Sequence, residues 1–123
     1  MGTGDVSKEN IQVIGRPGSR GGEHILEVKG RLTIATLFGF QDATRKENAP
    51  ELIIDMTGVP YIDSAGLGEL VATYVRAQKA SRKLAFAGMN ARVMAVIEMS
   101  HLSQFLHNYP TVKDAEAALS TSQ

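Results

Sequence analysis

Two short apolar segments near the amino end of the chain predict an antiparallel β-hairpin. The first is residues 11–14, IQVI, and the second is residues 24–30, HILEVKG, in which Leu26 and Val28 alternate with charged positions. Alternation with a period of two is typical of a strand that has one exposed face. Residues 15–22, GRPGSRGG, are rich in glycine and contain a proline, so they predict the connecting loop.

The next part of the chain predicts a helix followed by a buried strand. Residues 34–46 place one set of side chains on a single helical face, formed by Ile34, Leu37, Phe40 and Thr44. Pro50 prevents this helix from continuing. Residues 51–55, ELIID, centre on an apolar, β-branched run that is typical of a strand covered on both faces of a parallel sheet.

A second helix and a second buried strand follow. From Ala65 onward, apolar residues recur at the spacing of one helical face, at Leu67, Leu70, Val71, Tyr74 and Val75. Three polar side chains lie off this stripe, namely Glu69, Thr73 and Arg76. Residues 83–88, KLAFAG, predict another buried strand, which ends at Gly88.

The last third of the chain predicts two more helices and a short strand. Asn90 is placed to cap a helix over residues 91–99, whose buried side would be Val93, Val96 and Ile97. Residues 104–109 predict a short strand. Thr111 and Asp114 then form a loose capping box at the start of the final helix.

The order of these elements, β-β-α-β-α-β-α-β-α, predicts a single α/β domain, with a mixed β-sheet of about four to five strands and about four helices. We expect the domain to span residues 10–119, between a flexible N-terminal tail over residues 1–9 and a C-terminal tail over residues 120–123. The polar amino end lacks the apolar centre of a signal peptide. No apolar run approaches the roughly 20 residues of a membrane span.

Composition narrows the functional classes. The 123 residues carry 13 basic and 13 acidic side chains, so the chain lacks the broad positive field that non-specific nucleic-acid binding requires. The absence of cysteine excludes disulfides and thiolate metal sites and fits a reducing compartment. His24, His101 and His107 show no metal-ligand spacing. We therefore expect a cytoplasmic protein with no metal and no cofactor.

The candidate chemistry lies in residues 61–70, YIDSAGLGEL, where the first buried strand leads into the second helix. Ser64 could be a helix N-cap, a catalytic nucleophile or an acceptor of phosphate. As a cap, its hydroxyl would accept a backbone N–H of the first turn, and Ser64→Ala would cost about 1 kcal/mol. Gly66 and Gly68 weaken that turn and bare its backbone, which indicates that another group approaches closely.

The catalytic interpretation of Ser64 has the least support. A nucleophile elbow has the pattern G-x-S-x-G, but Ile62 occupies the position of the first glycine. No histidine lies in a motif that supplies a general base, and the sequence contains no nucleotide-binding glycine motif. A small serine hydrolase is therefore the weakest of the alternatives.

A phosphate on Ser64 would act as a switch on the surface. It would add about −1.5 to −2 charges, near the positive end of a helix dipole and beside Asp63, which repels it. We expect the fold to persist while the surface changes sign at this point. A protein docked there would meet an uncompensated charge, at a cost of several kcal/mol.

Residues 52–71, LIIDMTGVPYIDSAGLGELV, resemble the STAS family, which comprises sulfate-transporter cytoplasmic domains and bacterial anti-sigma factor antagonists. The shared pattern is an apolar strand, a short turn and the motif D-S-x-G-L-G. The resemblance extends through residues 10–119 and implies the STAS fold. It also implies a binding module that is not an enzyme, makes no direct contact with nucleic acid, does not insert in a membrane, and is a monomer or a weak homodimer.

In antagonists of this family, an anti-sigma factor that is also a serine kinase phosphorylates the serine after the aspartate, here Ser64. The resemblance implies that the unphosphorylated protein binds this kinase and frees a sigma factor. It implies that a phosphatase then restores the unphosphorylated form. It also implies a partner-binding surface formed by Thr33, Asp63, Ala65, Gly66, Leu67 and Gly68.

Two positions depart from the family pattern. Many relatives carry an acidic residue at the position of Thr33, and many carry Ser or Thr at the position of Ala65. Thr33 favours a divergent subgroup, whereas Ala65 leaves Ser64 as the only hydroxyl at the tip of the turn. The main alternative function is therefore a STAS scaffold subunit of a stress-signalling assembly or of a lipid-transport complex.

Overall fold

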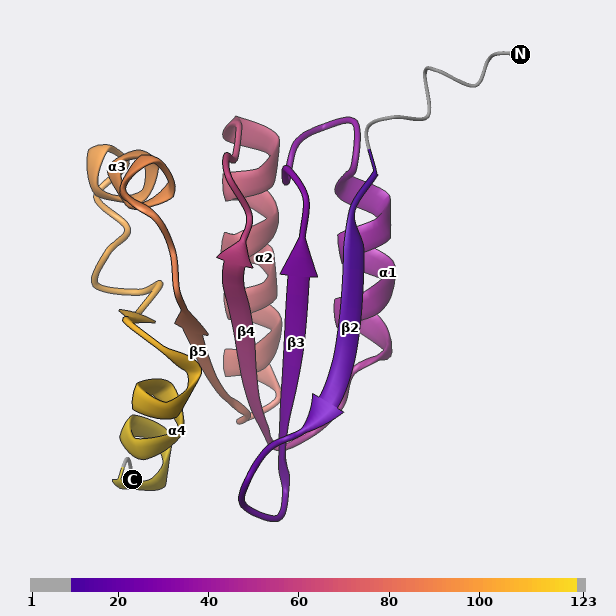
Figure 1. The fold of residues 1–123 in the computed structure, drawn as a ribbon, viewed down its shortest axis with the longest axis vertical. Helices are drawn as coiled ribbons and strands as arrows, with labels where there is room; N and C mark the ends of the chain where they lie inside the picture. Colours follow the sequence, from indigo (N-terminus) through magenta and orange to yellow (C-terminus); the bar gives the residue numbers. More distant parts are fainter. Residues whose placement is uncertain (1–9, 122–123) are drawn as a thin grey trace.

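The computed structural model describes residues 10–121, which form a single α/β domain with one mixed five-stranded sheet (Figure 1). The strands are β2 (Gln12–Pro17), β3 (Glu23–Lys29), β4 (Glu51–Gly58), β5 (Lys83–Ala87) and β6 (Asn108–Tyr109). The helices are α1 (Leu37–Lys46), α2 (Ser64–Lys79), α3 (Ala91–Met99) and α4 (Val112–Thr121). The predicted fold class is confirmed.

The strands lie in the order β2-β3-β4-β5-β6, which is also their order along the chain. β2 and β3 form the predicted antiparallel hairpin, and every later neighbour pairs in parallel. Parallel neighbours require crossover helices, and these cover both faces of the sheet. The crossover after β4 brings the chain to the start of α2, where the candidate chemistry lies.

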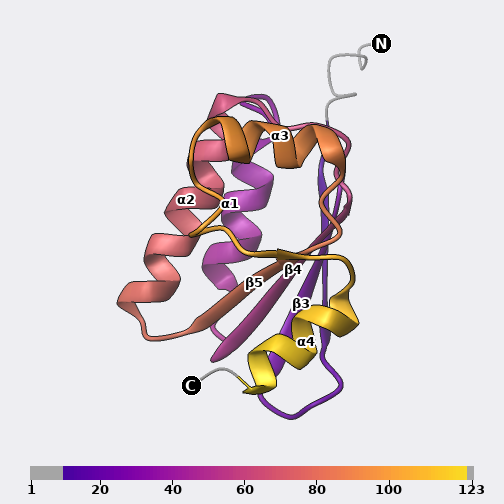
Figure 2. The same cartoon turned by 90° about the vertical axis from the view of Figure 1, so that its left-hand side faces the viewer.

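Helices lie on both sides of the sheet (Figure 2). Two apolar clusters lie between these helices and the sheet. The larger cluster packs the sheet against α1, α2 and α3, and its fully buried side chains include Phe40, Ile54, Leu70, Phe86 and Val93. The smaller cluster lies under α4 and consists of Ile25, Ile53, Ala85, Ala87, Ala115 and Leu119. This double cover explains why the central strands lack a clean polar alternation.

Several element boundaries differ from the predicted ones. β2 continues through Pro17, which pairs with His24, so the connecting loop is shorter than residues 15–22. α1 begins at Leu37 rather than at residue 34. The preceding residues form a turn in which Thr36 Oγ1 accepts from Thr33 N at 3.0 Å and donates to the Arg31 carbonyl at 2.7 Å.

The buried face of α2 is more polar than its apolar stripe predicts. Leu70 is buried as expected, but Val75 is 39% exposed, whereas Glu69 and Thr73 are buried. The cause is α1, which lies alongside and supplies Gln41 as one partner of the buried carboxylate, while Arg76 of α2 is the other. Glu69 Oε1 accepts from Gln41 Nε2 at 2.9 Å, and Glu69 Oε2 accepts from Arg76 Nη2 at 3.1 Å.

The carboxyl-terminal elements form largely as predicted. Asn90 caps α3, since its Oδ1 accepts from Val93 N at 2.8 Å. Thr111 Oγ1 accepts from Asp114 N at 3.1 Å at the start of α4. Only the last two residues of the predicted strand 104–109 form β6.

The predicted tails lie mostly beyond what the structure describes. α4 includes residues 120 and 121, whereas residues 122–123 and the predicted tail 1–9 lie outside the described residues. Among residues 10–121, no helix combines the length and the apolar character that crossing a membrane requires.

Candidate functional site at the amino end of helix α2

Ser64 is the first residue of α2 and is exposed to solvent. Residues 59–63 lead to it from β4, and this segment is fixed because Val59 and Ile62 are buried in the larger cluster. A parallel bridge between Leu32 and Ile62 ties the segment to the chain after β3. No group within residues 10–121 forms a hydrogen bond with the Ser64 hydroxyl, so the fold presents this oxygen on a rigid support.

The N-cap of α2 is Asp63, so the predicted capping role of Ser64 is wrong. Asp63 has an extended backbone, and its Oδ1 accepts from Gly66 N at 2.8 Å. Its Oδ2 accepts from Ile34 N at 3.0 Å, which fastens the turn before α1 to the start of α2. Aspartate and serine are equally good caps, and the second tether to Ile34 accounts for the choice of Asp63.

These hydrogen bonds set the protonation of Asp63. Partial burial acts to raise the pKa of its carboxyl group, but the N–H groups of Gly66 and Ile34 outweigh burial and hold the pKa below its ordinary value. The carboxylate is therefore charged at neutral pH, one residue before the Ser64 hydroxyl. Gly66 N, one of the amides that a negative group at the helix start would use, is already engaged by Asp63.

The two glycines of the motif have different roles. A Cβ on Gly66 would lie 2.2 Å from the Leu32 carbonyl oxygen, so the group that approaches Gly66 is the protein's own backbone. A Cβ on Gly68 would have nothing within 4 Å, and Gly68 is exposed. Gly66 therefore serves the fold, whereas Gly68 leaves open surface one turn from Ser64.

The other predicted site residues divide between surface and core. Thr33 lies in the turn before α1, where its Oγ1 accepts from Ala35 N at 3.2 Å. Its neighbour Ile34 bonds Asp63, so the Thr33 turn and the start of α2 form one region. Ala65 is half-buried, and Leu67 is half-buried against the larger cluster. Leu67 therefore contributes mainly to packing.

Two apolar residues near this region were not predicted as site residues. Ile34 is 68% exposed and Phe38 is 78% exposed, although apolar side chains of this size are usually covered. Ile34 was expected on the buried face of α1, but the turn at Thr36 delays the helix and turns Ile34 outward. Phe38 lies off the predicted buried face of the helix, and this position was the signal in the sequence that its side chain would be exposed.

The histidines do not complete a catalytic arrangement with Ser64. His24 Nδ1 lies 2.6 Å from Glu47 Oε1, and His107 Nε2 lies 2.7 Å from the Gln104 carbonyl oxygen. His101 lies in the loop after α3 with a positive φ of 60°. Since none of these contacts involves Ser64, the geometry gives no support to a serine hydrolase.

Comparison with known proteins is consistent with this geometry. The family model of the STAS domain matches residues 10–115. An anti-sigma factor antagonist from Mycobacterium paratuberculosis has a TM-score of 0.79 at 24% identity, covering 90% of this chain and 95% of that chain. The Bacillus cell fate determinant SpoIIAA in its phosphorylated form has a TM-score of 0.62 at 12% identity, covering 89% and 98%.

A transporter contains the same fold. The murine Solute Carrier 26 family member A9 anion transporter, in its inward-facing state, has a TM-score of 0.76 at 18% identity. The match covers 93% of this chain but only 22% of the transporter chain. The fold therefore occurs both as nearly the whole of a small protein and as a part of a much larger one.

Proposed function

The chain belongs to the STAS domain family, and on that premise we propose that it is an anti-sigma factor antagonist switched by phosphorylation of Ser64. Unphosphorylated, it binds an anti-sigma factor that is also a serine kinase, and this releases a sigma factor in the cytoplasm. The kinase transfers a phosphate to Ser64, and a phosphatase removes it. The protein itself acts by binding and not by catalysis.

The observation that carries this proposal is the exposed Ser64 hydroxyl beside a cap that is already complete. A phosphate on Ser64 brings about −1.5 to −2 charges, but the Gly66 amide of the first turn is already engaged by Asp63. The phosphate therefore gains less from the helix than it would at an empty cap and adds to the negative charge of Asp63. The cap and the fold remain, while the surface acquires a concentrated negative charge.

A docked partner loses affinity for this reason. Covering Ser64 would bury its phosphate beside the Asp63 carboxylate, and a buried unpaired charge costs several kcal/mol. Exposed Ile34 and Phe38 supply the apolar contact area that a specific protein interface requires. The proposed interface thus combines Ser64, Gly68 and Thr33 with these two apolar side chains.

The transporter similarity favours a second candidate function, a scaffold subunit of a larger assembly. In that case the exposed apolar side chains would be covered permanently, and Ser64 would not be modified. Size separates the two functions. A stable multi-protein particle that contains the chain and persists whether or not phosphatase is added would support the scaffold, whereas a complex that dissociates on phosphorylation would support the antagonist.

Phosphate transfer tests the proposal directly. The purified protein is incubated with ATP and the candidate anti-sigma kinases of its source organism, and its intact mass is measured. We expect an increase of about 80 Da, one phosphate, that Ser64→Ala abolishes. Ser103→Ala is the matched control, because Ser103 is also an exposed serine, and it should accept the phosphate normally. Equal phosphorylation of Ser64→Ala and the parent protein would contradict the proposal.

A further inference from the structure

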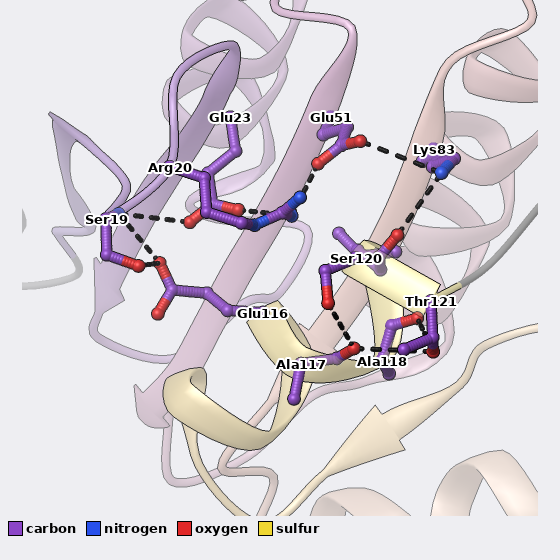
Figure 3. A network of polar contacts seen from close by, with 11 residues as sticks. Ser19, Arg20, Glu23, Glu51, Lys83, Glu116, Ala117, Ala118, Ser120 and Thr121 are labelled. Atoms are coloured by element: carbon purple, nitrogen blue, oxygen red, sulfur yellow. Dashed lines mark hydrogen bonds and ion pairs between the residues drawn. The ribbon is translucent and has the colours of Figure 1, made fainter.

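A network of charged side chains lies where β3, β4 and β5 begin (Figures 1 and 3), whereas Ser64 follows the opposite end of β4. It joins the loop after β2 to β3, β4, β5 and α4, and the proposed switch does not use it. Its charged members are Arg20 in the loop, Glu23 on β3, Glu51 on β4, Lys83 on β5 and Glu116 on α4.

Two carboxyl groups meet at one backbone donor in this network. Ser19 N lies 2.9 Å from Glu116 Oε2 and 3.2 Å from Glu23 Oε2, and the Ser19 hydroxyl donates to the same Glu116 oxygen at 2.9 Å. The Glu23 side chain is completely buried. Both carboxyl groups thus contact the same amide, and a proton shared between them would join the start of β3 to α4 directly.

Among its members within residues 10–121, the network has one more negative group than positive groups when all of them are ionised. Arg20 Nη2 lies 2.6 Å from Glu23 Oε1 and 2.6 Å from Glu51 Oε1. Lys83 Nζ lies 3.7 Å from Glu51 Oε2 and donates to the Leu119 carbonyl of α4 at 3.2 Å. These two cations face three carboxylates, so a single bound proton makes the group neutral.

The two carboxyl groups bind that proton unequally. Burial raises the pKa of Glu23, and the nearby Glu116 raises it further, while Arg20 opposes the change. The hydrogen bond with Glu23 lowers the pKa of Glu116, and the Ser19 amide lowers it further. The pair therefore takes up a first proton readily and a second one reluctantly.

The apolar attachment of α4 is small, which makes this contact important. Within the described helix, only Ala115 and Leu119 are buried. The polar contacts to Ser19 and Lys83 add to this attachment. Beneath α4 lie the apolar side chains of Ile25 and Ile53, which α4 covers.

We propose that Glu23 and Glu116 form a proton-operated latch that holds α4 against the start of β3. With one shared proton the latch is closed and α4 is docked most firmly. Loss of that proton leaves two carboxylates repelling each other, which loosens α4 and uncovers the sheet face at Ile25 and Ile53.

The direction of the pH effect follows from linkage. Glu23 has a raised pKa in the fold, so its contribution is lost as the pH rises through that pKa. Glu116 has a lowered pKa, so its contribution is lost as the pH falls through that pKa. Docking of α4 is therefore firmest between the two pKa values and weaker on either side.

Hydrogen exchange of the α4 amides tests the latch in the full-length protein. Rates are corrected for the intrinsic effect of pH and compared between about pH 5 and about pH 8. We expect a several-fold loss of protection in α4 at the higher pH. In Glu116→Gln the amide can donate to ionised Glu23, so the loss of protection with rising pH should be smaller than in the parent protein. Glu98→Gln on exposed α3 is the matched control and should behave like the parent protein.

Unchanged α4 protection in the parent protein would overturn the proposal, as would a pH response in Glu116→Gln equal to that of the parent. Carbon-13 NMR titration of the Glu23 and Glu116 carboxyl groups in the parent protein gives a second readout that needs no variant. We expect two separated steps, one above and one below the ordinary glutamate pKa. Two independent, ordinary titrations would overturn the latch even if Glu116→Gln failed to fold.

Discussion

Replacing each glycine of the G-L-G motif by alanine should have opposite effects on stability. In Gly66→Ala the new Cβ would lie 2.2 Å from the Leu32 carbonyl oxygen, about 0.8 Å inside the 3.0 Å limit that real Cβ contacts respect. Leu32 cannot move freely, because its carbonyl accepts from Asp63 N at 3.3 Å and its amide donates to the Tyr61 carbonyl at 3.1 Å. The overlap therefore disturbs the whole junction.

The size of the effect can be worked from these contacts. Overpacking of this kind costs about 1–3 kcal/mol, and a weakened backbone hydrogen bond costs about 1 kcal/mol more. The higher helix propensity of alanine returns about 1 kcal/mol. We expect a net loss of about 2 kcal/mol, which lowers Tm by about 8 °C in a domain of this size.

Gly68→Ala is the matched control, since it makes the same chemical change two residues later. Its Cβ would meet nothing within 4 Å, so the propensity gain of up to about 1 kcal/mol should appear undiminished. Urea denaturation of both variants measures the two free energies of unfolding. Similar free energies for the two variants would refute the assignment of Gly66 to the fold and Gly68 to open surface.

Three further predictions concern the same site. Asp63→Ala should lower the free energy of unfolding by about 2 kcal/mol and Asp63→Asn by about half of that, because asparagine can still cap Gly66 but turns a donor toward Ile34 N. Urea denaturation at neutral pH would measure both variants. Equal stabilities of the two variants would contradict the double tether. Since the pKa of Asp63 is lowered in the fold, its contribution is present above the ordinary aspartate pKa and lost as the pH falls through the lowered value, so the stabilities of the parent and Asp63→Asn should converge in acid. Phe38→Ala should leave Tm within about 2 °C, because this exposed side chain adds little to stability, yet weaken partner binding in a titration; unchanged affinity would remove Phe38 from the interface.

The sequence predicted the elements and the fold class because the periods of its apolar residues are clear. The strands expected at 51–55 and 83–88 and the helix expected from Ala65 onward lie where the patterns indicate. The predictions are wrong where contacts between distant segments determine where a helix begins or which side chains are buried. α1 starts late because the Thr36 hydroxyl closes a turn with Arg31, and Glu69 is buried because α1 supplies Gln41.

The sequence located the candidate site but did not give the roles of the individual residues in it. The motif identified Ser64, yet the cap moved by one residue because the second carboxylate oxygen of Asp63 reaches Ile34. The role of Gly66 depends on the Leu32 carbonyl, 34 residues earlier in the chain, which no local pattern reports. Because Ser64 is not the cap, Ser64→Ala should lower the free energy of unfolding by less than about 0.5 kcal/mol, and not by the roughly 1 kcal/mol expected for a lost cap.

The most direct test of the account is the affinity of one partner for two forms of the protein. A partner captured by the unmodified protein from a lysate of the source organism is purified and titrated against unmodified protein and against protein phosphorylated at Ser64. Thermal melting confirms that both forms are folded. We predict a Kd at least about 30-fold weaker for the phosphorylated form, the equivalent of about 2 kcal/mol. Equal affinity for both folded forms would contradict the claim that charge at Ser64 controls recognition.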